Sequence, residues 1–249
     1  MKKLLALFGV TAALPFFTQA QVSFTGTYIE NFDTIGASGT TYPAGWNGLR
    51  YAGTTASGPL TLGVTTGSTT TGGLYNVGAS GDTDRALGTL SSGTTISRFG
   101  LQLVNNSGAT VNQIIFSGVS EQWRTGTSAT ANETVTFEYS INATDINDPG
   151  ATFVPLSTMD LTEIQTASTT GGAIDGNNAA NQIVISGTIS SASWADGAAL
   201  TIRWSDHDDG GSDGLYALDN FSMTAVPEPS ALALLGLGAI GLLARRFRR

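Results

Sequence analysis

The nine residues ETVTFEYSI, at positions 133–141, decide the fold class of this chain. Apolar and polar side chains alternate along them, and the apolar set is Val135, Phe137, Tyr139 and Ile141. Successive side chains of a β-strand point to opposite faces of its sheet. A period of two therefore predicts a strand with one face in a core and the other in solvent.

Further stretches with β character lie on both sides of this strand, at residues 22–29, 60–64, 99–103, 111–120, 183–185, 200–204 and 215–225. Pairs that favour turns separate them, namely Asn47-Gly48, Asp175-Gly176, Asp196-Gly197 and Asp213-Gly214. Segments 65–71 and 166–172 are rich in Gly, Ser and Thr and are predicted loops. The pattern predicts an all-β fold, an antiparallel jelly roll or β-sandwich formed as one domain by residues 21–225.

This predicted domain is strongly acidic. Between Gln21 and Ala225 there are eighteen acidic residues against five arginines and no lysine, a formal charge of −13. Such a surface repels nucleic acid phosphates and attracts divalent cations, so nucleic acid is not expected as a partner. The chain has no cysteine, so a hydrophobic core or a metal must hold the domain in place of disulfides.

The N-terminal residues have the order of a secretory signal peptide. Lys2 and Lys3 precede an apolar stretch at residues 4–17, and the small residues Thr18 and Ala20 follow it. A basic start, an apolar middle and a small-residue end are typical of a signal peptide, which is predicted here at residues 1–20.

The C-terminal residues form a second candidate targeting segment, with a proline-containing start, an apolar run and a basic end. Val226, Pro227, Glu228 and Pro229 precede an apolar run at residues 231–244, and the chain then carries Arg245, Arg246, Arg248 and Arg249. At about 1.5 Å per residue the run reaches about 21 Å, short of a hydrocarbon core of roughly 30 Å, so it spans only with its flanks. We expect one C-terminal transmembrane helix with its arginines in the cytoplasm and residues 21–225 on the far side.

The Pro-Glu-Pro signature, short apolar helix and terminal basic cluster resemble the PEP-CTERM sorting signal. In that family an exosortase in the inner membrane of Gram-negative bacteria recognises and processes the signal. The resemblance implies that Val226 to Pro229 form the recognition site and that residues 226–249 are a sorting and anchor segment. It also implies a protein exported, tethered briefly to the inner membrane, and then placed at the cell surface or outside the cell. Because such systems accompany exopolysaccharide production, it further implies an association with extracellular polysaccharide.

The body also resembles the β-sandwich ectodomains that often precede such tails. Five segments carry this resemblance: residues 30–33, 43–46, 85–88, 121–124 and 217–221. It supports the predicted fold more than any one function.

Asp219 is the first candidate metal ligand, because strand alternation places it on the same face as Phe221 and Met223. A carboxylate on an apolar face needs a cation or several donors. The region resembles jelly-roll carbohydrate-binding modules, which implies a structural calcium held by Asp219 with Glu30 or Asp33. A salt bridge to Arg203, or a bulge that turns Asp219 outward, would serve instead.

The segment 206–214, Asp-His-Asp-Asp-Gly-Gly-Ser-Asp-Gly, is a second candidate, because it offers the oxygen ligands that calcium prefers. It fails as an EF-hand loop, since Ala217 stands where the twelfth-position glutamate is required. An acidic turn between two strands is the other interpretation.

Two tryptophans are candidates for stacking on sugar rings. Trp46 stands beside Asn47-Gly48 and Trp194 stands close to Asp196-Gly197, so both would be exposed if these pairs form turns. Burial at the ends of the sandwich is the alternative for both.

We expect no enzyme, because the body lacks cysteine, a nucleophile elbow, a phosphate-binding loop and zinc-type spacing. The leading hypothesis is an exosortase-sorted surface or matrix protein associated with exopolysaccharide. A secreted carbohydrate-active hydrolase, with two carboxyl groups some 5 to 10 Å apart, is one alternative. A calcium-stabilised adhesive module is the other.

Overall fold

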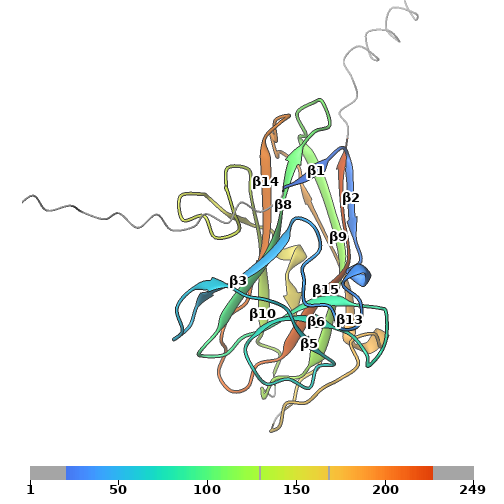
Figure 1. The fold of residues 1–249 in the computed structure, drawn as a ribbon, viewed down its shortest axis with the longest axis vertical. Coiled ribbons are helices and arrows are strands. Elements are labelled where there is room, and N and C mark those ends of the chain that lie inside the picture. The colour runs from blue at the N-terminus through green and yellow to red at the C-terminus, as the bar shows by residue number, and fades with distance from the viewer. Residues whose placement is uncertain (1–20, 129, 168, 227–249) are drawn as a thin grey trace, which may run out of the picture.

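The computed structural model describes residues 21–226 except 129 and 168, and this part of the chain is an all-β sandwich, as predicted (Figure 1). The first sheet contains β1 (Val22–Phe24), β3 (Trp46–Ala52), β4 (Gly58–Pro59), β8 (Ile96–Asn105), β10 (Thr134–Ser140), β11 (Val154–Pro155), β12 (Leu161–Thr162) and β14 (Ala199–Ser205). The second contains β2 (Thr27–Glu30), β5 (Gly63–Thr65), β6 (Gly73–Val77), β7 (Ala86–Leu90), β9 (Gln113–Arg124), β13 (Gln182–Ile189) and β15 (Leu215–Val226). Three short 3-10 turns complete the described part: η1 (Asp33–Ile35), η2 (Ser157–Met159) and η3 (Ala179–Asn181).

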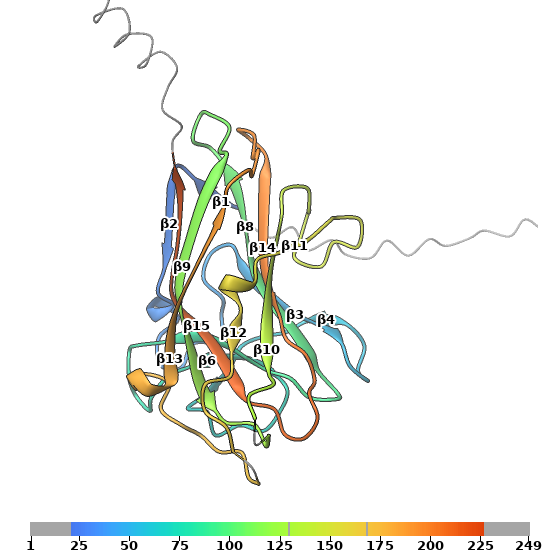
Figure 2. The same cartoon turned by 180° about the vertical axis from the view of Figure 1, so that it is seen from behind.

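Both sheets are mainly antiparallel. Along its main path the first sheet has the order β11-β10-β14-β8-β3-β4, with β1 parallel to β8. The second has the order β13-β9-β15-β7-β6-β5, with β2 paired to β15. Strands far apart in sequence are therefore neighbours, and the two layers face each other in Figures 1 and 2.

The period-two pattern explains the core between the layers. Phe137 of β10, Phe99 of β8 and Trp204 of β14 are fully buried and pair across the first sheet. The rings of Phe99 and Trp204 stack with centroids 5.5 Å apart. Phe221 of β15 meets Trp204 edge to face at 5.6 Å, so aromatic contacts join the two sheets.

β15 is the central strand of the second sheet and is bent by a β-bulge. It pairs with β9 along its length, with a register shift between Asp219 and Ser222, where Asn220 adopts a positive φ of 48°. On its other side the partner changes at this point from β7 to β2. The bulge therefore allows one strand to serve two neighbours.

Two of the predicted turns are wrong, because neither Asn47-Gly48 nor Asp213-Gly214 forms one. Asn47 and Gly48 lie inside β3, where they pair with Gly100 and Phe99 of β8. Gly48 is needed here for close packing, because a Cβ at this position would collide with the side chain of Leu74. By contrast, Asp196-Gly197 does form a turn, with Gly197 at φ 76°.

The predicted signal peptide and the predicted C-terminal helix lie outside the described residues. Within residues 21–226, leaving out 129 and 168, no helix is long and apolar enough to cross a membrane.

Candidate functional site

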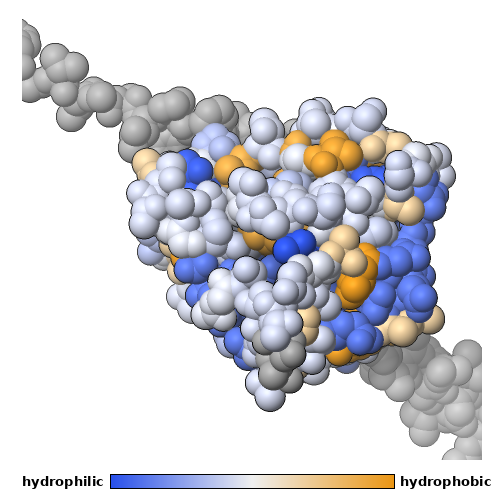
Figure 3. All heavy atoms as spheres, turned by 90° about the horizontal axis from the view of Figure 1, so that it is seen from below, coloured by the Kyte–Doolittle hydropathy of each residue, from blue (hydrophilic) through white to orange (hydrophobic). Residues whose placement is uncertain are grey.

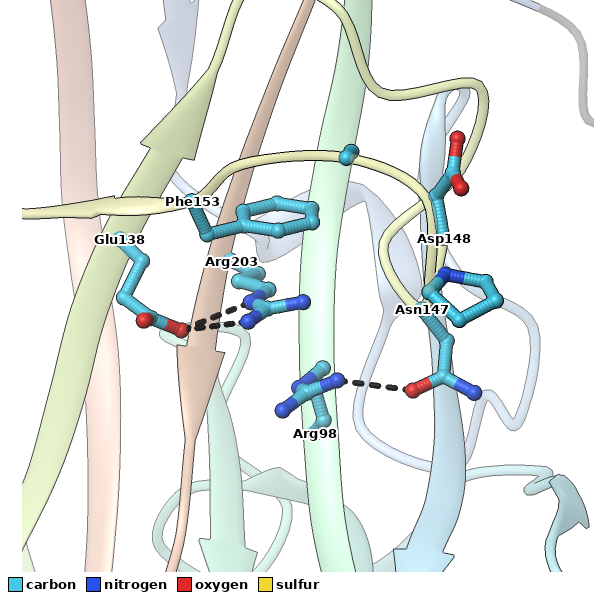
Figure 4. Close-up of a pocket in the computed structure, with 8 residues that line it drawn as sticks. Arg98, Glu138, Asn147, Asp148, Phe153 and Arg203 are labelled. Carbon is cyan, nitrogen blue, oxygen red and sulfur yellow. Dashed lines mark hydrogen bonds and ion pairs between the residues drawn. The ribbon is translucent and has the colours of Figure 1, made fainter.

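A pocket of about 460 Å³ lies on the outer face of the first sheet (Figure 4). Residues 98, 138 and 203 alternate with core residues along β8, β10 and β14, so their side chains point away from the core. The segment 141–153, between β10 and β11, passes over this face and forms the other wall. Gly100 permits this approach, because a Cβ there would lie 2.9 Å from Cγ2 of Ile146.

Arg203 is fixed on three sides. Its Nη2 lies 2.7 Å from Oε2 of Glu138, and its Nε donates to the same oxygen at 2.8 Å. Its Nη1 donates to the carbonyl of Ile146 at 3.1 Å, and the ring of Phe153 covers the guanidinium at 3.3 Å. The pairing of Glu138 with Arg203 across β10 and β14 is what places the two charges together.

Arg98 is held more loosely than Arg203. Its Nε donates to Oγ of Ser205 and its Nη1 donates to Oδ1 of Asn147, both at 2.8 Å. The guanidinium lies 4.1 Å from the centre of the Tyr51 ring. Within the part of the chain that the structure describes, it has no ion pair with a carboxylate, and its Nη2 has no hydrogen-bond acceptor.

The charge of Arg98 persists in spite of its burial. Burial first, and then repulsion from Arg203, lower the pKa of Arg98 to about 10. The side chain therefore remains cationic at neutral pH. It presents a charged N–H from which a ligand oxygen could accept a hydrogen bond.

Asp148 lines the same pocket, but protein donors occupy its carboxylate. Thr144 donates to Oδ2 from both its backbone N–H, at 2.9 Å, and its hydroxyl, at 2.8 Å. Gly150 N–H donates to Oδ1 at 2.8 Å. These hydrogen bonds lower the pKa of Asp148, so it stays ionised.

The predicted sugar platforms at Trp46 and Trp194 are wrong. Their exposed fractions are 1% and 0%, so neither ring has a face open to a ligand. Trp46 stacks on Trp204 at 6.0 Å and donates from Nε1 to the Tyr28 hydroxyl. Trp194 packs on Phe24 at 5.1 Å and donates to the Ala198 carbonyl. For Trp46 the cause is the strand that replaces the predicted turn.

The predicted calcium ligands Glu30, Asp33 and Asp219 do not form one ligand set. The backbone and side-chain N–H groups of Asn220 occupy Oδ1 and Oδ2 of Asp219, each at 2.6 Å. Arg85 N–H donates to Asp33 Oδ1 at 3.0 Å, and Phe32 N–H donates to Glu30 Oε1 at 2.8 Å. Among the described residues no three acidic or histidine side chains lie close enough to hold a metal.

Asp219 is nonetheless buried, as the alternation predicts. Burial raises its pKa to about 7, and the hydrogen bond from Asn220 opposes that rise. The predicted salt bridge to Arg203 is absent, because Arg203 pairs with Glu138. The N–H groups of Asn220, at the bulge, are thus the donors to the Asp219 carboxylate where the sequence predicted a cation.

The C-terminal residues match a known family model, that of the PEP-CTERM protein-sorting motif, over residues 225–249. This protein carries a PEP-CTERM sorting motif. The motif implies that the protein is exported and processed by an exosortase. The match confirms the sequence-based recognition of the tail, and it begins where the last strand of the sandwich ends.

Several solved structures are similar to the sandwich of this PEP-CTERM protein. The K2 cleaved adhesin domain of Lys-gingipain is 12% identical over 80% of this chain and 98% of its own length, with a TM-score of 0.44. The K3 adhesin domain from Porphyromonas gingivalis is 14% identical over 74% and 93%, with a TM-score of 0.42. A xylan-binding domain from Paenibacillus barcinonensis is 14% identical over 76% and 90%, with a TM-score of 0.35. No curated protein sequence matches the chain.

The arginine pocket is the site that sequence reasoning missed. Arg98 and Arg203 both stand at polar positions of alternating strands, which shows that they face outward but not that they face each other. Their proximity depends on the pairing of β14 with β8, where Arg203 lies opposite Gly100 and Ser205 opposite Arg98. The two guanidinium groups and the amide can donate to the hydroxyl or carboxylate oxygens of a sugar, the two carboxylates can accept from its hydroxyls, and the partly exposed ring of Phe153 can pack on it.

Proposed function

We propose that this PEP-CTERM protein is a non-enzymatic surface or matrix protein that binds extracellular polysaccharide in the arginine pocket. Before processing, the apolar run at residues 231–244 holds it to the inner membrane with the sandwich on the outer side. After processing, the sandwich is carried to the cell surface or the matrix. Its contact with polysaccharide is made by the outer face of the first sheet.

The observation that carries the proposal is the state of Arg98. The domain has only five arginines and no lysine among eighteen acidic residues, and two of the five share this pocket. One of the pair has a carboxylate partner and the other has none among the described residues. A guanidinium that lines a pocket and keeps an unused N–H is placed to donate a charge-assisted hydrogen bond to a ligand oxygen.

The two carboxylates of the pocket support a binding function more than a hydrolytic one. A glycosidase needs a general acid, that is, a carboxyl group whose pKa is raised. Hydrogen bonds instead lower the pKa of Asp148. Glu138 is engaged by two nitrogens of Arg203. Protein donors thus engage both carboxylates of the pocket, as in a binding site with a fixed geometry.

The test is affinity electrophoresis of the full chain through gels that contain the producing organism's exopolysaccharide, a neutral glucan or a polyuronate. Arg98→Gln removes the free charged donor and should weaken binding to the recognised polymer roughly 10- to 100-fold. Arg50→Gln is the matched control, because Arg50 lies on β3 outside the pocket and donates to the Ala56 carbonyl. Thermal melting of each variant checks that the fold is retained.

Retardation of the wild type and of Arg50→Gln, but not of Arg98→Gln, would support the pocket as the site. Equal retardation of all three would place binding elsewhere. If no polymer retards the wild type, the polysaccharide function is wrong, although export and sorting would stand.

A further inference from the structure

A second group of acidic residues lies at the opposite end of the strands from the segment 141–153, at the lower end of the sandwich in Figures 1 and 2. Glu133 immediately precedes β10 and Glu163 immediately follows β12. The two strands pair with Thr134 opposite Thr162, and Glu163 N–H donates to the Glu133 carbonyl at 3.2 Å. The loop 206–214, between β14 and β15, reaches the same place, because Gly214 N–H donates to Glu133 Oε2 at 2.6 Å.

Asp213, in this loop, is a buried carboxylate without a partner. The residue is 8% exposed, and neither Oδ1 nor Oδ2 has a hydrogen-bond donor among the described residues. Glu163 is 7% exposed, and its Oε1 also lacks a donor there, while its Oε2 accepts from Asn132 N–H. Three buried carboxylate oxygens at one end of the molecule are therefore unsatisfied. This is costly for any charged group removed from water.

Glu133 adds a further available oxygen. Gly214 N–H and the Tyr216 hydroxyl both occupy its Oε2, the latter at 2.9 Å. Its Oε1 lies close to Gly126, because a Cβ added there would collide with that oxygen and would lie 2.9 Å from the Ser212 carbonyl oxygen. Oε1 of Glu133 therefore lies near a carbonyl oxygen of the loop itself, that of Ser212, which directly precedes Asp213.

Protein cations do not neutralise this group. The one ion pair among the described residues joins Arg203 to Glu138 in the arginine pocket. The nearby Asp206 is satisfied by other donors, because Thr89 Oγ1 donates to its Oδ2 and His207 N–H donates to its Oδ1. Asp213 itself has neither an ion pair nor a hydrogen-bond donor among the described residues. The electrostatic conditions favour a bound cation.

We propose that Asp213 and Glu133 bind a calcium ion at this end of the sandwich, with Glu163 beside it. Carbonyl oxygens and water complete the coordination, since calcium takes six to eight oxygen ligands in flexible geometry. Two carboxylates with carbonyls suit the described residues, which contain no cluster of three acidic or histidine ligands. The ion ties the loop 206–214 to the start of β10. The site is separate from Asp219, whose oxygens already have donors.

The surface of this end is formed mainly by polar residues. Seen from below, it is mostly pale or hydrophilic, with small separate apolar spots, as loops of Gly, Ser, Thr and Asp produce (Figure 3). Long loops of this composition make few apolar contacts of their own. A cation that joins two of them would order this end of the domain.

The experiment measures thermal melting of the full chain in chelator and in millimolar Ca²⁺. Wild type should gain about 5 to 10 °C when Ca²⁺ exceeds its Kd about 100-fold. Asp213→Asn should lose this gain. In chelator it should melt no lower than wild type, because neither carboxylate oxygen of Asp213 has a donor to lose. That result distinguishes loss of a ligand from simple damage to the fold.

Asp219→Asn is the matched control, since it changes a buried acid of the same type that already has donors. It should keep the full response to calcium. Terbium(III) luminescence gives a readout independent of stability, because Tyr216, hydrogen-bonded to Glu133, lies beside the site and can sensitise the ion. Wild type should show terbium luminescence that decreases when calcium displaces the terbium. Asp213→Asn should show no such luminescence.

The proposal is overturned if wild type melts equally in chelator and calcium and binds no terbium. It is also overturned if Asp213→Asn responds to calcium as wild type does. Loss of the response in Asp219→Asn with retention in Asp213→Asn would move the ion to the site expected from the sequence.

Discussion

Glu121→Gln should remove much of the dependence of stability on pH. Glu121 lies on β9, is 2% exposed, and accepts hydrogen bonds from Trp123 Nε1 and Gln182 Nε2, each at 2.8 Å. Burial, chiefly, raises its pKa from 4.5 to about 8, and repulsion from Asp219 and Asp84 adds to the rise. The protonated form is therefore favoured in the folded state.

The sign follows from the higher folded-state pKa. The stability contribution of protonated Glu121 is fully present below the unfolded-state pKa and is lost as pH rises through the folded-state pKa. A rise from 4.5 to about 8, at about 1.4 kcal/mol per pH unit, corresponds to roughly 5 kcal/mol lost between these pH values. Glutamine is never ionised, so the variant does not lose this stability as the pH rises. It can satisfy only one of the two donors, which costs about 1 kcal/mol at every pH.

The assay is urea unfolding of both proteins at pH 5, 7 and 9. Glu121→Gln should be about 1 kcal/mol less stable than wild type at pH 5 and more stable than wild type at pH 9. Other buried acids titrate in both proteins, so the difference between the two curves isolates Glu121. Parallel curves with a constant offset would refute the reasoning, because they would show that burial of this carboxylate does not control its proton.

Two further predictions concern packing. Trp46→Ala should destabilise the protein by about 3–5 kcal/mol, because the ring fills the core between both sheets, whereas Val184→Ala, at a position 77% exposed, should change stability by about 0.5 kcal/mol or less. Chemical denaturation measures both, and a stable Trp46→Ala that lost only sugar binding would contradict the burial of this ring. Gly100→Ala should loosen the segment 141–153 and weaken polysaccharide binding, because the new Cβ would collide with the Ile202 carbonyl and press on Ile146. Limited proteolysis should show faster cleavage of this segment than in wild type, and unchanged cleavage would contradict the close approach.

The strands were predictable because their signal is local. Val135 and Phe137 are buried as the alternation at 133–141 predicts, and so are Leu200, Ile202 and Trp204 in the next strand of the sheet. A period of two places one face inward whatever the partner strand is. Fold class therefore follows from short stretches of sequence.

Features that depend on strand pairing were not predictable in this way. Asn47-Gly48 has a strong local preference for a turn, but pairing with β8 and packing against Leu74 hold it in a strand. The burial of Trp46 follows from that strand. The pocket requires the register of three strands, which no single segment contains.

The surroundings of the buried acidic residues also depend on contacts that local sequence does not reveal. The sequence indicated a loop of oxygen ligands at 206–214, but the position of Asp213 beside other carboxylates depends on the hydrogen bond from Gly214 to Glu133, 81 residues earlier in the chain. The burial of Asp219 was predicted from alternation. Its partner was not, because the positive φ of Asn220 at the bulge decides it.

Export and sorting are tested most directly by the intact mass of the native protein recovered from the cell surface, the medium and the cytosol of its host. The mature species should begin near Gln21, lack the signal peptide at residues 1–20, and be cut or modified at the PEP-CTERM motif within 225–249. An unprocessed chain from Met1 to Arg249, found in the cytosol alone, would contradict both the export and the surface function proposed for the sandwich.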